Sequence, residues 1–425
     1  MTGRQSRSRA VAVTGIGIVT SLGAGREENW RQLAAGRSGI RRIARFDTAG
    51  LRTTIGGCVD GLGLESPSAA PFISLAMARA VAAEAIGQAG IGEPGRFPGG
   101  LFVAAPPLEH EWPQRMRLAE RAPGDRSRRT YADLFTAAGQ DSGDLHYDFC
   151  NGMIADRLAD ELGTEGSPIT ANTACASGAT VIKLGVESIR RGATAALAVG
   201  TDGSLQVEAL IRFSLLAALS TANAVPEQAA KPFAKNRDGF VMAEGAAALV
   251  LEDAESATAR GAEIIGYVLG CGEAADNFHR TRSNPSGDSI VQSMERAIAD
   301  AGLAPADIAY INAHGTGTPE NDKMEALGVH RLFGQHAERL AISANKSMIG
   351  HTLTAAGAVE ASFTLLALRD GLLPPTINHV LADPAIGLDV VPNQARRAAA
   401  EFALSNSFGF GGQNVSLVLG ATPGG

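Results

Sequence analysis

Cys175 has the surroundings of a reactive residue. It stands in the segment NTACASGAT, residues 172–180, and the preceding SPITANTA is typical of a strand. Apolar residues then recur on one helix face at Ala179, Ile182, Val186 and Ile189. We therefore predict a strand-to-helix turn with Cys175 near the helix N-terminus. Free N–H groups and the helix dipole lower the pKa of a thiol there and favour the nucleophilic thiolate. A buried cysteine that only packs is the alternative interpretation.

Two histidines stand where they could assist such a nucleophile. His314 follows a predicted strand in NAHGTGT, and His351 begins a predicted helix in NKSMIGH. Both lie beside glycine, so a ligand can approach closely. Glu360 lies inside an otherwise apolar helix, and Lys346 is the obvious cation to pair with it. Each histidine could instead be a core residue with its hydrogen bonds satisfied.

A glycine-rich turn near the C-terminus completes the set of candidate residues. In SNSFGFGGQN, Phe410 lies between glycines and can present its backbone N–H group in a tight turn. GIGIVTSLG has glycines after a strand, but Thr20 breaks the dinucleotide-binding pattern. HGTGTPENDK lacks the sequence Gly-Lys followed by Ser or Thr that ends a phosphate-binding loop.

Buried strands alternate with helices along the chain, which is typical of a mixed α/β fold with helices on the sheet faces. Strands are predicted at 9–17, 99–106, 195–203, 243–253, 262–272, 308–315 and 339–347, with a closing hairpin at 402–420. Helices are predicted at 26–33, 72–90, 254–262 and 289–303. The arginine-rich stretch 108–144 breaks this rhythm and indicates a surface excursion or a partner-facing segment.

Composition excludes several classes of protein. A length of 425 residues favours two lobes or domains, and 45% hydrophobic with 19% charged residues is typical of a globular chain. The net charge of −7 and only two Trp and four Tyr argue against a nucleic-acid binder. The four cysteines form no CxxC pair, so neither a zinc site nor a disulfide framework is expected. A reducing, cytoplasmic compartment is favoured.

The N-terminal residues superficially resemble a signal peptide. Basic residues precede an apolar run, but glycines interrupt that run and the helical pattern REENWRQL follows. We interpret the run as a first strand. No uninterrupted run of about 18 apolar residues occurs, so no membrane span is predicted.

The four motifs NTACASGA, NAHGTGT, NKSMIGH with AAGAVEA, and SNSFGFGGQN occur in this order. Together they resemble the β-ketoacyl-acyl carrier protein synthases of the elongating Cys-His-His type, over residues 10–419. The resemblance implies a thiolase-like five-layer αβαβα sandwich built from two similar halves, and a dimer. We place the halves at 1–258, with the cysteine, and 259–425, with both histidines.

The resemblance also implies roles for individual residues. Cys175 is the acylated nucleophile, His314 and His351 act in decarboxylation, and Lys346 with Glu360 supports them. Substrate-binding roles fall to the gate residue Phe410 and to Gly409, Thr316 and Thr318. The reaction is a decarboxylative Claisen condensation of malonyl-acyl carrier protein with the cysteine-bound acyl chain. It requires neither a metal nor another cofactor.

Other classes of protein fit the sequence less well. A thiolase needs a second catalytic cysteine near the C-terminus, but the last one here is Cys271. Chain-initiating synthases carry asparagine where the motif places His351, and a nitrilase-type hydrolase would leave two histidines unexplained. A non-catalytic chain-length-factor-like subunit of a ketosynthase heterodimer lacks the nucleophile, so Cys175 argues against that alternative.

The pathway and the partners are less sharply defined. GFGGQN, the segment ALIRFSLLAALST and the arginine-rich excursion are unusual, which favours a specialised type II fatty acid pathway or a reduced, polyene-type polyketide pathway. The chain would act as a homodimer or beside a chain-length-factor-like subunit. Acyl carrier proteins are acidic, so a basic docking patch is expected. Its candidates are Lys231, Lys235 and Arg237, and Arg126, Arg128 and Arg129, with ordinary surface charge as the alternative.

Overall fold

A single large sheet organises the computed structural model, which describes residues 10–63, 69–122, 130–140 and 143–424. The sheet has 11 strands, and its first half has the order β6–β5–β7–β8–β1. These strands are β1 (Val11–Thr20), β5 (Gly100–Ala104), β6 (Ile169–Ala171), β7 (Ala195–Asp202) and β8 (Gly245–Asp253). The short strand β2 (Gly23–Ala24) pairs with β1.

The second half of the sheet repeats the first. Its order is β11–β10–β14–β15–β9, and it joins the first half through antiparallel pairing of β1 with β9. These strands are β9 (Gly266–Ala275), β10 (Ile308–Asn312), β11 (Ala341–Ser343), β14 (Phe402–Phe408) and β15 (Gln413–Gly420). In each half the last two strands in the chain lie between the first strand and the parallel pair, so the two halves have one topology.

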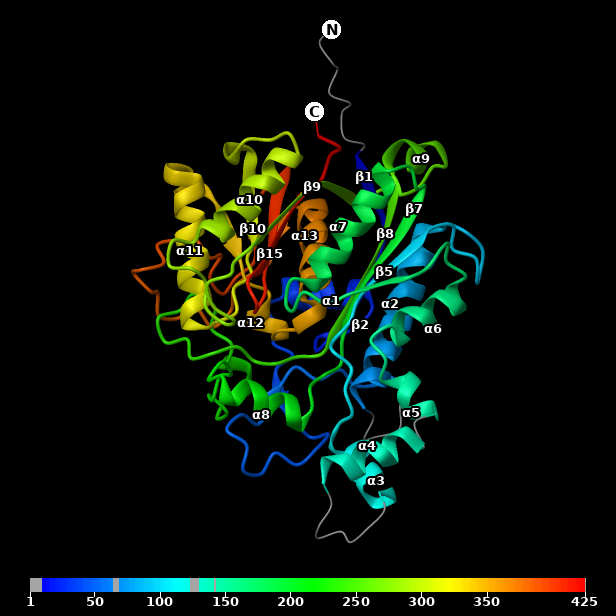
Figure 1. Cartoon of the computed structure of the whole chain (residues 1–425). Helices are drawn as coiled ribbons and strands as arrows, with labels where there is room; N and C mark the ends of the chain where they lie inside the picture. The colour runs from blue at the N-terminus through cyan, green and yellow to red at the C-terminus, as the bar shows by residue number, and fades with distance from the viewer. Residues whose placement is uncertain (1–9, 64–68, 123–129, 141–142, 425) are drawn as a thin grey trace.

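Helices make the remaining layers. α2 (Ala70–Ala89) and α6 (Met153–Leu162) cover the first half of the sheet, while α10 (Asp288–Asp300) packs on the second half with α11 (Pro319–Phe333) beside it. Two central helices, α7 (Ser177–Arg190) and α13 (Ala356–Asp370), contact both halves of the sheet (Figure 1). This arrangement is the predicted five-layer αβαβα sandwich. The domain limits at residues 258 and 259 stay a prediction.

Two glycines let the central helices meet at their N-terminal ends. A Cβ atom on Gly178 would lie 2.4 Å from the backbone nitrogen of Ala358, and one on Gly357 would lie 2.3 Å from that of Ala179. Only glycine permits so close an approach of two backbones. The contact brings the residues just before α7 beside those just before α13. Gly178 therefore serves helix packing.

The predicted elements agree closely with the observed ones at the centre of the fold. β1 is fully buried and pairs with both β8 and β9, which confirms the predicted first strand. The helix predicted at 72–90 is α2, with Pro71 in its first turn and Gly90 closing it at a φ of 57°. The closing hairpin is β14 and β15.

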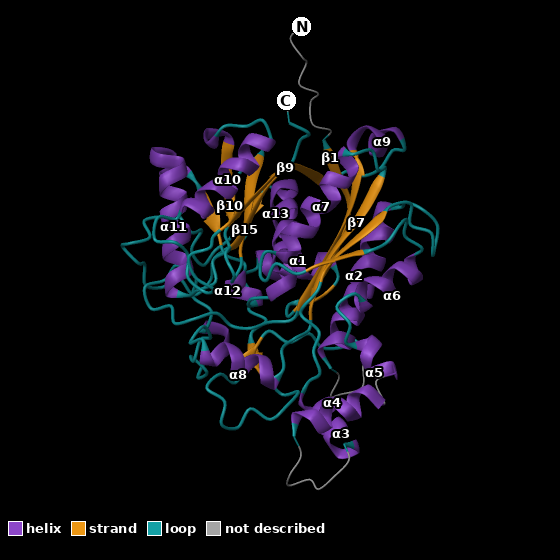
Figure 2. Cartoon of the chain, viewed as in Figure 1, coloured by secondary structure: helices purple, strands orange, loops and turns teal. Residues whose placement is uncertain are grey.

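The arginine-rich stretch forms three short helices, α3 (Trp112–Arg121), α4 (Tyr131–Gln140) and α5 (Gly143–Asp148). Figures 1 and 2 show them grouped at one end of the molecule, away from the sheet. Trp112 and Phe135 are exposed there. The stretch is therefore a surface excursion, as predicted, with helical structure that the sequence analysis did not anticipate.

By length and composition alone, α2 could cross a membrane. Its apolar window is 56% buried inside the fold, and the helix packs against β1 and β8. A core helix of a water-soluble protein has the same properties, so α2 gives only weak support for a membrane span. The cytoplasmic location stays a prediction.

Candidate active site

The nucleophile turn lies between β6 and α7, where the sequence places it. Ala174 adopts a positive φ of 51°, which is unusual for a residue with a side chain and turns the chain sharply before Cys175. Ser177 braces the turn, because its hydroxyl donates to the carbonyl of Ala174 at 2.6 Å and accepts from the N–H of Thr173 at 2.8 Å. The turn therefore holds the thiol in a fixed position.

Both predicted histidines lie beside this thiol. Nε2 of His351 is 3.2 Å from Sγ of Cys175, and the ring centres of His314 and His351 are 5.4 Å apart, edge to face. His314 follows β10 directly, as predicted. His351 lies between the short helix α12 (Lys346–Ile349) and α13, so it does not begin a helix as the sequence suggested. The contact between the two central helices brings Cys175 and His351 together.

Each imidazole is fixed as a hydrogen-bond donor through its Nε2 atom. The N–H of Leu353 donates to Nδ1 of His351 at 3.2 Å, and Nζ of Lys346 lies 3.4 Å from Nδ1 of His314. Burial lowers the pKa of both histidines well below the usual value, and the charge of Lys346 acts in the same direction. Both rings are therefore neutral, and the single hydrogen of each is on Nε2.

The positions of these two hydrogens also decide whether the site suits a metal ion. The ligand atoms of Cys175, His314 and His351 lie within 4.8 Å of one another, close enough to surround a cation. A histidine binds a metal through an unprotonated nitrogen, but both Nε2 atoms carry their hydrogen here. The arrangement fits an anion or a carbonyl oxygen better than a metal.

The prediction of an acidified cysteine is wrong for the free site. Burial raises the pKa of the Cys175 thiol to about 11, although the charge of Lys346 and the backbone N–H of Phe410 lower it. α7 begins only at Ser177, so the helix terminus does not overcome the loss of water around the sulfur. The thiol form dominates at neutral pH until substrate or hydrogen bonds favour the thiolate.

We expect alkylation of Cys175 by iodoacetamide to become faster up to about pH 10 without levelling off. The thiolate is the reactive form, and with a pKa of about 11 its fraction grows about tenfold per pH unit over this range. Free cysteine, with a pKa near ~8.5, should level off above about pH 9. Mass spectrometry of the peptide containing Cys175 measures the rate. A plateau below pH 8 would show that the local dipoles dominate.

Lys346 and Glu360 form the predicted pair. Nζ of Lys346 donates to Oε1 of Glu360 and, at 2.7 Å, to the carbonyl oxygen of His314. Their side chains are 2% and 1% exposed, so each charge depends on the other. Burial raises the pKa of Glu360 to about 7, while Lys346 opposes this shift. The pair fixes the backbone and the Nδ1 environment of His314.

Glu325 is a site residue that the sequence analysis missed. Its carboxylate accepts the backbone N–H groups of His314 and Gly315, each at 2.8 Å, and the side-chain amide of Asn406 at 3.3 Å. Glu325 lies on α11, more than one helix turn after the motif NAHGTGT that contains His314. A buried acidic residue in the otherwise ordinary helical pattern after NAHGTGT was the only available signal.

The glycine-rich turn packs directly on the nucleophile turn. A Cβ atom on Gly409 would lie 2.8 Å from the carbonyl oxygen of Thr173 and 3.4 Å from the nitrogen of Ala176, so a side chain there would displace the turn. The backbone N–H of Phe410 points to Cys175. The hydroxyl groups of Thr316 and Thr318 form a hydrogen bond of 2.9 Å. The Thr318 hydroxyl also caps the N-terminus of α11.

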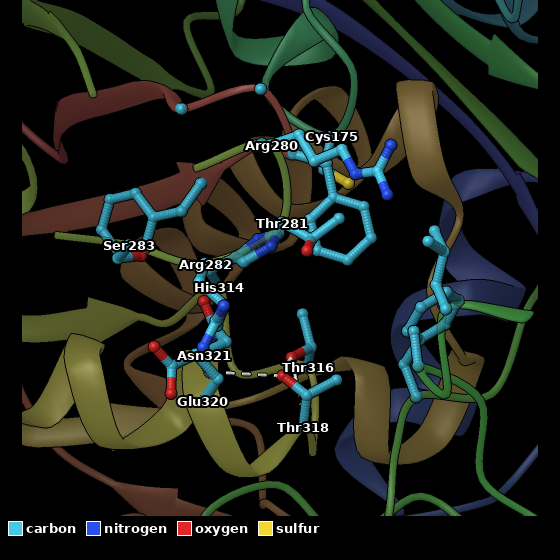
Figure 3. A pocket seen from close by; sticks show the side chains of 18 of the residues that line it. Cys175, Arg280, Thr281, Arg282, Ser283, His314, Thr316, Thr318, Glu320 and Asn321 are labelled. Carbon is cyan, nitrogen blue, oxygen red and sulfur yellow. Dashed lines mark hydrogen bonds between the residues drawn. The ribbon is translucent and has the colours of Figure 1, made fainter. Parts of the chain in front are cut away.

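A cavity of about 550 Å³ opens in front of these residues, within the usual size range of ligand pockets. Cys175, His314, His351, Phe410, Gly409, Thr316 and Thr318 all line it. One wall is apolar, formed by Phe213, Leu216, Ala217, Ala218, Phe240 and Leu353. Another is polar; Figure 3 shows Arg280, Thr281, Arg282 and Ser283 in one part of it and Glu320 and Asn321 in another. The sequence analysis did not single out these polar residues.

Known proteins match the chain along most of its length. The family model for the β-ketoacyl synthase N-terminal domain matches residues 8–257, and that for the C-terminal domain matches residues 265–380. A relative from Coxiella burnetii, named 3-oxoacyl-[acyl-carrier-protein] synthase 2, is 36% identical over 97% of this chain and 98% of its own. A Vibrio cholerae relative of the same name is 36% identical over 97% and 99%.

Solved structures agree with this assignment. The ishigamide ketosynthase/chain length factor is 34% identical with a TM-score of 0.83, covering 98% of this chain and 100% of its own. The ketosynthase complex AntDE:AntF, with a type II polyketide synthase acyl-carrier protein, is 29% identical with a TM-score of 0.85 and coverages of 98% and 100%. The chain belongs to the β-ketoacyl synthase family, and it is a condensing enzyme with the thiolase-like ketosynthase fold.

Proposed function

We propose that the chain joins a Cys175-bound acyl group to the two-carbon unit of malonyl-acyl carrier protein, in a specialised type II fatty acid or reduced polyketide pathway. The observation that carries the proposal is the 3.2 Å contact between Sγ of Cys175 and Nε2 of His351 at a cavity that a second neutral imidazole also lines. A thiol nucleophile and two N–H donors are the groups that this reaction needs.

The first step transfers the acyl group to the enzyme. The sulfur of Cys175 attacks the carbonyl carbon of the carrier thioester, a new C–S bond forms, and the bond to the carrier sulfur breaks. The carrier sulfur leaves with the proton that Cys175 gives up. The backbone N–H groups of Cys175 and Phe410 stabilise the negative oxygen of the tetrahedral intermediate.

The second step makes the carbon–carbon bond. Malonyl-acyl carrier protein places its thioester oxygen between Nε2–H of His314 and Nε2–H of His351. Its terminal carboxylate leaves as CO₂, and the electron pair forms an enolate whose oxygen both donors stabilise. The enolate carbon then attacks the acyl-cysteine carbonyl, and the thiolate of Cys175 leaves. The product is a β-ketoacyl chain on the carrier, and the enzyme regains its thiol by taking up one proton.

The supporting residues act through His314 and the cavity wall. Lys346, held by Glu360, keeps Nδ1 of His314 occupied, so that its Nε2–H stays aimed at the substrate. The hydroxyls of Thr316 and Thr318 face the arm that carries the thioester. Lys346 and Glu360 are positioning residues in this scheme, because neither touches the reacting atoms.

Two segments with unusual sequences lie in the cavity wall or next to it, which supports a specialised pathway over ordinary fatty-acid elongation. Gln413 of GFGGQN donates to Glu273, which also pairs with Lys183, so this unusual glutamine is part of an ion-pair network behind the turn. The segment around α8 (Val207–Leu215) supplies Phe213, Leu216 and Ala217 to the apolar wall. The acyl chain would therefore contact residues that the sequence already marked as unusual.

The partners follow from the same proposal. An acyl carrier protein delivers both substrates, and a homodimer or a heterodimer with a chain-length-factor-like subunit is the assembly. The complex of AntDE:AntF and the ishigamide ketosynthase/chain length factor support these partners by likeness. The alternative, that this chain is itself a non-catalytic subunit, conflicts with Cys175 lining the cavity.

The set of candidate residues for the basic docking patch is smaller than the sequence predicted. The side chain of Arg237 is 8% exposed and pairs with Asp383 at 2.7 Å, so it is not available to a carrier protein. Lys235 is exposed and remains a candidate, together with the half-buried Lys231. Arg126, Arg128 and Arg129 lie outside the described residues.

Intact-protein mass spectrometry tests the proposal. The purified chain is offered acyl carrier proteins of graded acyl length and saturation, followed by malonyl-acyl carrier protein, with and without a chain-length-factor-like subunit. We expect an acyl adduct on Cys175 that malonyl-acyl carrier protein discharges, and the preferred acyl group defines the pathway. An adduct that forms only with the partner would identify a heterodimer. Absence of an adduct under every condition would support the non-catalytic alternative.

A further inference from the structure

Two arginines at the mouth of the catalytic cavity have no side-chain partner among the residues that the structure describes. Arg280 and Arg282 both line the cavity and both are exposed, unlike the buried His314 and His351. In the described part of the chain, neither side chain forms a hydrogen bond or an ion pair. Arg237, which lies nearby in the fold, is instead neutralised by Asp383. The two guanidinium groups at the mouth are therefore available to an anion from outside.

Backbone hydrogen bonds tie this arginine segment to the turn beside the nucleophile. The N–H of Gly411 donates to the carbonyl of Arg280 at 2.8 Å, and the N–H of Asp276 donates to the carbonyl of Gly412 at 2.7 Å. The same glycine-rich turn carries Phe410, whose N–H points to Cys175. These hydrogen bonds fix the backbone of the arginine segment relative to the turn that carries Phe410, and so relative to the thiol.

The charge at the mouth is positive. Arg280, Arg282 and Lys323 line the cavity as cations, against the carboxylates of Asp276 and Glu320. Asp276 is already occupied: it accepts the N–H groups of Phe278 at 2.9 Å and Asn284 at 2.7 Å, and the hydroxyl of Ser289 at 3.1 Å. An anion entering the mouth would therefore meet two guanidinium groups that form no ion pair with the described residues.

The cavity as a whole has a gradient of polarity. Its apolar wall reaches Phe240, whose ring packs against His351 with centres 5.2 Å apart. The exposed residues Arg280 and Arg282, labelled in Figure 3, line a polar part of the cavity. A ligand that fits has an apolar end, a thioester at Cys175 and an anionic end. A phosphopantetheine thioester has this order of groups, and guanidinium pairs bind phosphate in bidentate fashion.

We propose that Arg280 and Arg282 bind the phosphate ester of the phosphopantetheine arm while its thioester lies at Cys175. This inference rests on the proposed function and deepens it, because it names the group of the carrier substrate that the enzyme recognises at the mouth. The arginines act as positioning residues: they hold the arm in register with the nucleophile and take no part in bond making.

The test compares two small substrates that differ only in the phosphate. Acylation of Cys175 is measured by mass spectrometry with an acyl-pantetheine and with the corresponding acyl-phosphopantetheine. We expect the full-length enzyme to prefer the phosphorylated substrate by about 10- to 100-fold in kcat/KM. The double variant Arg280→Gln with Arg282→Gln should lose this preference, so that the two substrates react with similar kcat/KM.

Matched variants separate this role from general effects of charge. Arg280→Lys with Arg282→Lys keeps the charge and should retain part of the preference. Arg191→Gln removes an exposed arginine at the far end of α7 and should retain all of it. An unchanged preference in the double glutamine variant would overturn the proposal. So would a defect seen only with the whole carrier protein, since the arginines would then contact its surface. Failure of the unaltered enzyme to react with any thioester would instead count against the proposed function.

Discussion

Replacing Cys175 with alanine is expected to abolish condensation while leaving decarboxylation of malonyl-acyl carrier protein measurable. The variant has no atom to hold the acyl group, so formation of the β-ketoacyl product should fall on the order of 10⁴- to 10⁶-fold. The Nε2–H donors of His314 and His351 remain, because their Nδ1 partners are Lys346 and Leu353 rather than the thiol. Release of CO₂ and formation of acetyl-carrier protein measure the surviving step.

A second cysteine supplies the control for this experiment. Cys150 lies beyond the catalytic cavity, where its thiol contacts the backbone carbonyl of His146 at 3.2 Å. Cys150→Ala should keep both condensation and decarboxylation. A Cys175→Ala enzyme that still elongates an acyl chain would show that another group carries the acyl intermediate. Loss of decarboxylation together with condensation would indicate that the thiol helps to shape the enolate site.

The sequence located the catalytic groups because each stands at the end of an element with a strong local signal. The strand β10 before His314 and the strand-to-turn pattern before Cys175 follow from buried apolar runs bounded by glycine. The approach of α7 to α13 is not local. It depends on Gly178 and Gly357 meeting across the two halves of the fold, and nothing in either segment alone indicates the other.

Electrostatic properties were harder to predict than positions. The position of Cys175 next to a helix N-terminus favoured a lowered pKa, but burial raises the pKa to about 11, because desolvation depends on every element around the sulfur. Arg237 was a docking candidate by its charge, yet Asp383, 146 residues away in the chain, binds it. Glu325 escaped notice because its partners are backbone N–H groups, which leave no mark on the sequence.

Replacing either histidine with alanine is expected to slow decarboxylation by roughly 100- to 1000-fold, the usual effect of removing one oxyanion donor. The two variants should differ in the first step. Nε2 of His351 is 3.2 Å from Sγ of Cys175, so its N–H also stabilises the attacking thiolate, and His351→Ala should acylate more slowly. His314 forms no hydrogen bond to the thiol and is held by Lys346 and Glu325, so His314→Ala should acylate nearly normally.

The design separates the two steps by measuring them on the same protein samples. Acylation is followed by the mass of the Cys175 adduct, and decarboxylation by release of CO₂ from malonyl-acyl carrier protein. His146→Ala, a substitution of an exposed histidine outside the catalytic cavity, serves as the control and should change neither rate. If either active-site variant decarboxylates normally, its Nε2–H is not a donor to the enolate oxygen. Equal acylation rates in the two variants would show that the contact between His351 and Cys175 does not stabilise the thiolate, because only that contact distinguishes the two histidines in this step.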